Sequence, residues 1–252
     1  MKVKDITNLL DELYPEYLKA SYDNVGLMVG NYDNEVERVF IALDLTREVM
    51  DEALKAKADL IITHHPLLFR PLSSINTAND PGSIIKDLIN NDITLFSMHT
   101  NFDTVKMNDL IGSILGINDR ELLSEKENCG IVGTIKESSV KEFAEVVKER
   151  LSLDEVIYVG DENVKISKVA LCAGSGSSMI NDAKEKNAHV FLTGDLSYSR
   201  ALEAKRLGLN MMVIPHHIEY LFYKAVEEEL HKFNDKLTII ISSIDPNPFK
   251  RY

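Results

Sequence analysis

The chain has 252 residues, of which 44% are hydrophobic and 27% are charged, and its formal net charge is -12. This length suffices for one large domain or for two of about 125 residues each. The acidity disfavours general binding to nucleic acid or to an anionic membrane, although a local basic patch is compatible with it.

The two cysteines, Cys129 and Cys172, are too few for a disulfide framework or a cysteine-type zinc site. The first residues contain no long apolar core like that of a signal peptide. No apolar run approaches the roughly 20 residues that a membrane helix needs. We therefore expect a soluble cytoplasmic protein with no membrane partner.

The first part of the chain alternates between predicted helices and strands. Asp5 is placed to cap a first helix, which ends near Pro15. Strands are predicted at 39–43, 60–62 and 93–96, with helices at 46–57 and 83–90 between them and a polar loop at 71–83. This alternation indicates an α/β fold with a parallel sheet.

The middle of the chain contains a second pattern. A strand at 130–135, an amphipathic helix at 140–151 and a strand at 156–159 form a small β-α-β piece within residues 126–165. A last strand is predicted at 237–241. We predict a first α/β domain at 1–125 and a second at 126–252 that includes this insertion.

The two halves show internal similarity. A displacement of 130 positions aligns RVFIALD (38–44) with KVALCAG (168–174) and ADLIITHH (58–65) with AHVFLTGD (188–195). After the loop the displacement becomes 117, which places His99 on His216. Few residues are identical, but the agreement over several elements indicates a duplication. The expected fold is therefore two pseudo-symmetric α/β domains with mostly parallel sheets.

Five of the seven histidines follow predicted strands: His64, His65, His99, His216 and His217. The carboxyl ends of parallel strands share the edge at which ligands bind in open α/β folds. Carboxylates accompany them, because Asp103 follows His99 by four residues and Glu219 follows His216 by three, which puts each pair on one face of a helix. The other two histidines, His189 and His231, are interpreted as surface or hydrogen-bonded residues.

Imidazole and carboxylate ligands without thiolate suit divalent Zn, Mn, Fe, Ni or Co, and these side chains are enough for two ions. Two other features leave alternatives open. Asp195 either orients an imidazole or caps the helix that begins near Ser197. The turn at 174–178 either contacts a phosphate or is a plain turn before a helix.

Six segments together resemble the NIF3 family, whose bacterial members are named type 2 homologues of GTP cyclohydrolase I. They are, in order, SYDNVGL (21–27), ALDLT (42–46), THHPLLF (63–69), MHTNFD (98–103), TGD (193–195) and PHHIE (215–219). The resemblance implies two α/β domains, a site for two metal ions between them, and a ring-shaped homohexamer. It places the metal ligands at His64, His65, Asp103, His216 and Glu219. Between His216 and His217, the spacing of three to Glu219 favours His216.

Three functions are compatible with these residues. The first is a metal-dependent hydrolase acting on a small, nucleotide-like substrate, with His99 or Asp195 as candidate general acid or base. The second is a non-enzymatic metal-handling or adaptor protein that uses the same ligands. The third, a ring that binds nucleic acid through lysines such as Lys55, Lys57 and Lys184, is opposed by the net charge.

Overall fold

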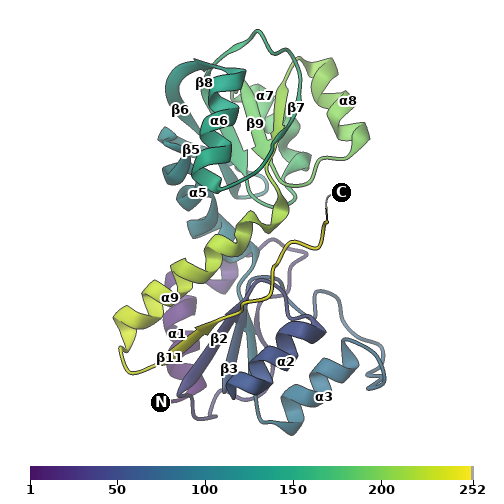
Figure 1. Cartoon of the computed structure of the whole chain (residues 1–252), viewed down its shortest axis with the longest axis vertical. Helices are drawn as coiled ribbons and strands as arrows, with labels where there is room; N and C mark the ends of the chain where they lie inside the picture. Colours follow the sequence, from purple (N-terminus) through teal and green to yellow (C-terminus); the bar gives the residue numbers. More distant parts are fainter. Residues whose placement is uncertain (251–252) are drawn as a thin grey trace. The chain divides into compact units, whose positions relative to one another are not determined.

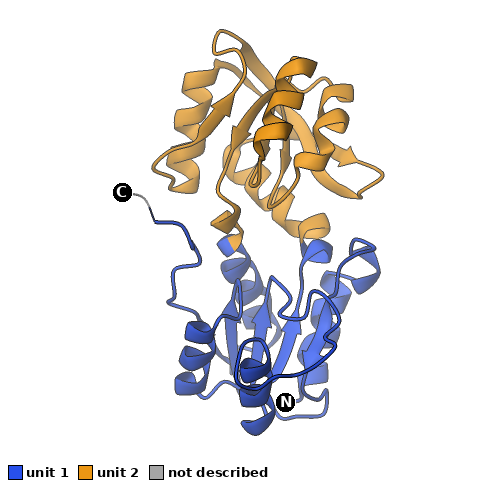
Figure 2. Ribbon diagram, turned by 90° about the vertical axis from the view of Figure 1, so that its right-hand side faces the viewer, with its two compact units in different colours: residues 1–102, 220–252 blue, residues 103–219 orange. Residues whose placement is uncertain are grey.

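The computed structural model describes residues 1–250 and contains two compact units (Figure 2). The first unit is formed by residues 1–102 together with the segment from 220 onward, and the second by residues 103–219. These bounds differ from the predicted division between residues 125 and 126. The reason is strand pairing, because β11 (Thr238–Ile241) pairs in parallel with β2 (Arg38–Ala42), while β5 (Asn118–Ser124) pairs with β6 (Cys129–Ser139).

The first unit is built on a sheet whose strand order is β1-β4-β3-β2-β11 (Figure 1). Its other elements are α1 (Val3–Leu13), a 3-10 turn (Glu16–Leu18), β1 (Gly26–Val29), α2 (Arg47–Ala56), β3 (Leu60–Thr63), α3 (Gly82–Asn90), β4 (Thr94–Ser97), α4 (Thr100–Phe102) and α9 (Leu221–Phe233). All neighbouring strands are parallel except β1, which runs antiparallel to β4. The predicted strands at 39–43, 60–62 and 93–96 are thus confirmed as β2, β3 and β4.

Helices cover both faces of this sheet. Phe40, Ile61 and Leu95, from three neighbouring strands, pack into one core cluster with α2 and α3. Because side chains alternate along a strand, Val39 and Ile41 point to the opposite face, where Figure 1 shows α1 and α9. Covered faces explain why these strands are almost continuously apolar.

Local sequence signals set where two of the helices begin. Thr46 caps α2, because its Oγ1 accepts a hydrogen bond from Val49 N at 3.3 Å. The prediction for Asp5 is wrong, since α1 already begins at Val3. The Asp5 carboxylate instead accepts from Lys2 N at 2.8 Å, so it satisfies an N-terminal donor from inside the first turn.

The second unit has a sheet with the order β5-β6-β8-β9-β10-β7. Its other elements are a π-helical turn (Asp103–Met107), α5 (Asn108–Leu115), α6 (Val140–Leu151), β7 (Ile157–Val159), β8 (Lys165–Cys172), a 3-10 turn (Ser177–Met179), α7 (Ile180–Glu185), β9 (Val190–Thr193), α8 (Tyr198–Leu207), β10 (Asn210–Val213) and a second 3-10 turn (His216–Tyr220). The strands β8, β9 and β10 are parallel, and the other pairings are antiparallel.

The two sheets repeat one arrangement, in which an antiparallel strand precedes three parallel ones. In the first unit β1 pairs with β4, and in the second β7 pairs with β10. The predicted 156–159 strand is therefore the counterpart of β1. The displacement of 130 holds for the first two parallel strands, since Val39 and Leu60 pair as Val169 and Val190 do.

The third parallel strand corrects the sequence alignment. Leu60 pairs with Thr94 and Val190 pairs with Asn210, so the displacement there is 116 rather than 117. In a strand, one residue of displacement transfers a side chain to the other face, and the hydrophobic pattern of this short strand does not distinguish the two alignments.

Helix α6 begins with a capping box that provides a testable prediction. Ser139 Oγ accepts from Glu142 N at 3.2 Å, and Glu142 Oε2 accepts from Ser139 N at 2.7 Å. We expect Ser139→Ala to lower the free energy of unfolding by about 1 kcal/mol, measured by urea denaturation. The matched control is Ser138→Ala, because Ser138 Oγ is buried without a hydrogen-bond partner among residues 1–250 and its loss should be neutral or stabilising. Equal destabilisation by both changes would contradict the cap assignment.

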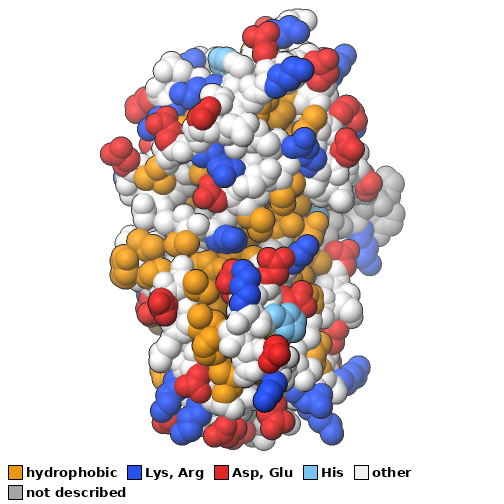
Figure 3. All heavy atoms as spheres, turned by 90° about the vertical axis from the view of Figure 1, so that its left-hand side faces the viewer, with side chains coloured by type: hydrophobic (Ala, Val, Ile, Leu, Met, Phe, Trp, Pro, Cys, Tyr) orange, Lys and Arg blue, Asp and Glu red, His pale blue; other side chains and the backbone are white. Residues whose placement is uncertain are grey.

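On the face drawn in Figure 3, lysine and arginine side chains are interspersed with aspartate and glutamate. Among the described residues, none of the helices is both long and apolar enough for a membrane crossing.

Candidate metal centre

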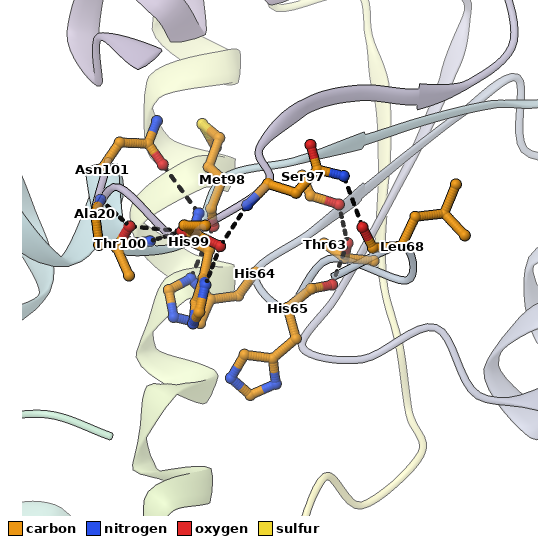
Figure 4. Close-up of polar contacts among 12 residues, drawn as sticks. Ala20, Thr63, His64, His65, Leu68, Ser97, Met98, His99, Thr100 and Asn101 are labelled. Carbon is orange, nitrogen blue, oxygen red and sulfur yellow. Dashed lines mark hydrogen bonds and ion pairs between the residues drawn. The ribbon is translucent and has the colours of Figure 1, made fainter. Parts of the chain in front are cut away.

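The first histidine group lies at the carboxyl ends of β3 and β4. His64 and His65 directly follow β3, and His99 follows β4 by two residues. The strands are parallel with Thr63 opposite Ser97, so the three side chains leave the same edge of the sheet (Figure 4). Thr63 Oγ1 donates to His65 O at 2.9 Å and accepts from Ser97 Oγ at 2.8 Å. This buried hydroxyl pair fastens the turn that carries the histidines.

The three imidazoles form a compact cluster. Their candidate ligand atoms all lie within 4.8 Å of one another, and the group could hold a metal ion. The ring centroid of His64 lies 5.1 Å from that of His65 and 5.2 Å from that of His99. The cluster belongs entirely to the first unit.

Hydrogen bonds determine which nitrogen of His64 carries the proton. His64 Nδ1 lies 2.9 Å from Met98 O, and a carbonyl oxygen can only accept, so Nδ1 donates. In the neutral ring, Nε2 then carries the lone pair that a metal ion requires. Metal-ligating histidines commonly donate their other ring N–H in this way.

Two carboxylates do the same for the other imidazoles. His65 Nδ1 lies 2.8 Å from Asp44 Oδ1, and His99 Nδ1 lies 2.9 Å from Asp23 Oδ1. An ionised carboxylate only accepts, so both rings donate through Nδ1. All three imidazoles of the cluster therefore have the same tautomer, with the proton on Nδ1. Each of them is oriented by a hydrogen bond from Nδ1 to its own oxygen acceptor.

Asp23 is held as a carboxylate by its neighbours. It is buried, and it accepts from Thr100 N at 3.1 Å and Thr100 Oγ1 at 2.5 Å as well as from His99. Burial acts to raise the pKa of Asp23, but the hydrogen bonds from His99 and Thr100 outweigh it and lower the pKa to about 2. The acceptor for His99 thus stays charged across the neutral pH range.

Aromatic rings fix the position of His64. The ring of Phe222, on α9, lies 5.2 Å from that of His64, and the ring of Phe102 lies 5.9 Å away. Phe102 and Phe222 contact each other edge to face at 4.9 Å. His64 itself is fully buried, so packing as well as hydrogen bonding restricts its rotation.

The second group, in the second unit, consists of His216, Glu219 and Asp195. His216 Nε2 lies 3.1 Å from Glu219 Oε2, and His216 Nδ1 lies 2.8 Å from Asp195 Oδ2. The pKa of His216 is raised to about 9, and the hydrogen bond with Glu219 is the largest cause. Burial lowers the pKa, and the contact with Asp195 raises it further. The i,i+3 spacing, in a 3-10 turn, does place His216 beside Glu219.

The two alternatives for Asp195 are resolved by these contacts. Helix α8 is capped by Ser197, whose Oγ accepts from Arg200 N at 3.4 Å. Asp195 is the hydrogen-bond acceptor for His216. Its position resembles that of Asp44 beside His65, so imidazoles of both units are oriented by carboxylates.

The glycine-serine turn at 174–178 packs against this second group. Gly174 O accepts from Gly194 N at 2.8 Å and from Asp195 N at 3.1 Å. A Cβ at Gly174 would lie 2.5 Å from Glu219 Oε1, and its φ is +59°. The turn therefore depends on glycine for close approach to the carboxylate.

Asp103 is the first residue of the second unit and is largely buried. It opens a π-helical turn, a geometry that is frequent at functional sites. Asn108 Nδ2 donates to Asp103 O at 3.0 Å, and Asn108 Oδ1 accepts from Ala173 N at 2.8 Å. One asparagine thus connects the Asp103 segment to the turn beside Glu219.

The predicted site residues fall into these groups. His64, His65 and His99 are brought together in the first unit, and His216, Glu219 and Asp195 in the second. His189, interpreted from the sequence as a surface or hydrogen-bonded residue, is exposed and accepts from Ser167 N at 3.1 Å. Sequence reasoning assigned no role to the orienting residues Asp23 and Asp44. A usable signal existed for Asp44, which lies two residues after the buried strand β2, as His65 lies two residues after β3.

Each unit has a mixed sheet whose central strands are parallel, with histidines and carboxylates after those strands. This arrangement defines an α/β protein with groups that could hold a metal ion. Residues 1–248 match the Duf34/NIF3 (NGG1p interacting factor 3) family, so the chain belongs to that family. It is 38% identical to a protein of Clostridium perfringens named GTP cyclohydrolase 1 type 2 homolog, over 99% of both chains.

Solved structures of related proteins have the same fold. A Bacillus cereus protein related to NIF3 superposes with a TM-score of 0.92 at 27% identity, covering 100% of this chain and 99% of that one. Reduced HcgD from Methanocaldococcus jannaschii superposes with a TM-score of 0.86 at 33% identity, covering 97% of this chain and 98% of that one. The predicted family and the predicted fold are confirmed.

Proposed function

We propose that this protein is a metal-dependent hydrolase of a small, nucleotide-like substrate, and that His64, His65, Asp103, His216 and Glu219 hold two divalent ions. The observation that carries the proposal is the shared tautomer of His64, His65 and His99, each donating through Nδ1 to an oxygen. Core packing gives no reason for this repetition, whereas histidines that ligate a metal almost always donate their other ring N–H to an oxygen.

Chain connectivity supports a site that draws on both groups. The chain passes from the first unit to the second between Phe102 and Asp103, and it returns between Glu219 and Tyr220. Phe222 packs on His64 and lies three residues after Glu219, so their Cα atoms are at most about 11 Å apart. Asp103 directly follows Phe102, which also packs on His64. Covalent bonds thus limit how far these carboxylates lie from the histidine cluster, whatever the orientation of the units.

A divalent cation held there would supply Lewis-acid activation of water and stabilisation of developing negative charge. The residues of this chain would orient the ligands. Asp44 and Asp195 accept from His65 and His216, and the half-exposed Asp195 is positioned to exchange a proton with solvent. The names of its relatives make GTP the first substrate to test. In this proposal six copies assemble, so light scattering should give six times the 28.4 kDa of one chain.

The test is turnover by the metal-loaded protein. We expect the wild-type protein to convert GTP, or another member of a nucleotide and phosphoester panel, in a reaction that chelation abolishes and Asp103→Asn reduces at least a hundredfold. Chromatography of the products provides the measurement. Metal binding without turnover of any panel member would refute the hydrolase and favour the metal-handling alternative.

A further inference from the structure

Five exposed large apolar side chains of the first unit line one pocket. The pocket has a volume of about 620 Å³ and lies between the loop before β1, the loop after β3 and helix α3. The exposed fractions of its large apolar side chains range from 39% to 64%; they are Tyr22, Phe69, Leu72, Ile75 and Ile89. Clustered apolar exposure of this kind marks a binding site rather than ordinary surface.

The walls of the pocket are held in place by hydrogen bonds. Asn24 Nδ2 donates to Leu68 O at 2.6 Å, which joins the loop before β1 to the loop after β3. Asp23, which also lines the pocket, is buried and accepts from Thr100 and His99. The pocket is therefore preformed, as small-molecule sites generally are.

The pocket adjoins the histidine cluster. The ring of Phe69 lies 6.2 Å from the ring of His99, and Asp23 both lines the pocket and orients His99. A ligand seated here would lie next to the candidate metal ligands of the same unit. This continuity favours a substrate over a protein partner.

The lining indicates the chemistry of the ligand. Tyr22 and Phe69 contact edge to face with centroids 6.4 Å apart, and both rings are exposed at the pocket, where a planar ring could stack on them. Arg70 lies at the pocket, is exposed, and forms no ion pair with any of residues 1–250. A guanidinium matches the geometry of phosphate.

We propose that this pocket binds the heteroaromatic ring of a phosphorylated nucleoside, with Tyr22 and Phe69 stacking on the base and Arg70 pairing with the phosphate. In this proposal the pocket is the part of the protein that selects the substrate. The inference therefore rests on the proposed function. Recognition relies on stacking and charge, and a metal ion held by the neighbouring histidines would supply the reactive end of the site.

The experiment is calorimetric titration of the metal-loaded, full-length protein with GMP and with guanosine. We expect Phe69→Ala to raise the Kd of both ligands about tenfold or more. Arg70→Gln should raise the Kd of GMP about tenfold and leave that of guanosine within twofold. The matched controls are Phe233→Ala, an exposed phenylalanine on α9, and Arg206→Gln, an exposed arginine on α8, and both should bind as the wild type does.

Because Phe69 contacts His99, Phe69→Ala could weaken ligand binding by displacing His99. Ile75→Asp changes the pocket at a different residue and therefore tests the pocket independently. It introduces a negative charge at an exposed position of the pocket and should weaken GMP binding more than guanosine binding. Absence of GMP binding, or equal affinities for wild type and all pocket variants, would overturn the proposal. A pocket change that alters only the oligomeric state in light scattering would also overturn it, because a second copy would then be the occupant. GMP binding without turnover in the same samples would refute the hydrolase but leave the pocket standing.

Discussion

The variant His65→Ala is expected to retain less than about a tenth of the wild-type metal after dialysis, as measured by inductively coupled plasma mass spectrometry. His65 sits at the end of β3 with Nδ1 donating to Asp44, so Nε2 is positioned to ligate. Loss of an orienting contact alone typically lowers metal affinity 10- to 100-fold, and loss of the ligand itself should do at least as much. Glu219→Gln should have a comparable effect.

Three comparisons make this result specific. His231→Gln changes an exposed histidine on α9 and should leave the metal content unchanged. Asp44→Asn keeps the ligand His65 but removes the charged acceptor, and its metal affinity should fall between wild type and His65→Ala. His216→Ala should lose metal while His217→Ala retains it, because His216 contacts both Glu219 and Asp195. Equal metal in His65→Ala and His231→Gln would show that the ligand set is incorrect.

The second large effect concerns the packing beneath His64. Phe222→Ala removes a fully buried ring of α9 that contacts Phe102 and His64, and it should lower the free energy of unfolding by about 3–5 kcal/mol. Urea denaturation followed by circular dichroism measures this. Phe233→Ala, the same substitution at the exposed end of the same helix, should change the free energy by less than about 1 kcal/mol.

The comparison tests whether α9 belongs to the core of the first unit. Similar small effects of Phe222→Ala and Phe233→Ala would mean that α9 is peripheral. Phe222→Leu should recover part of the lost stability, because it refills much of the cavity with apolar volume. A Phe222→Leu protein that is stable but binds metal weakly would show that the ring also positions His64.

The metal-ligand candidates were accessible to sequence reasoning for a definite reason. A continuous apolar run predicts a buried strand, and polar residues directly after it lie at the edge where parallel strands end. That argument identified His64, His65 and His99, and in the structure their candidate ligand atoms all lie within 4.8 Å of one another. It found the pairing of His216 with Glu219 through spacing alone.

Other features depended on contacts between segments that are distant in the sequence. Asp23 orients His99 across 76 positions, and no local pattern encodes which carboxylate accepts from which imidazole. The displacement of 116 in the third parallel strand follows from hydrogen-bond register, which a short apolar strand does not reveal. The pocket around Phe69 likewise joins two loops and a helix.

The sequence by itself determined the α/β class, the family, the main strands and the residue types of the candidate metal centre, because periodicity and short motifs are local properties of the chain. The tertiary structure alone decided that the C-terminal strand β11 pairs with β2 and that α9 packs on His64. It also decided that Nδ1 carries the proton on His64, His65 and His99. These features depend on which surfaces come into contact after the chain returns to the first unit. The residues that stabilise those contacts are far apart in the sequence, so no local pattern reveals them.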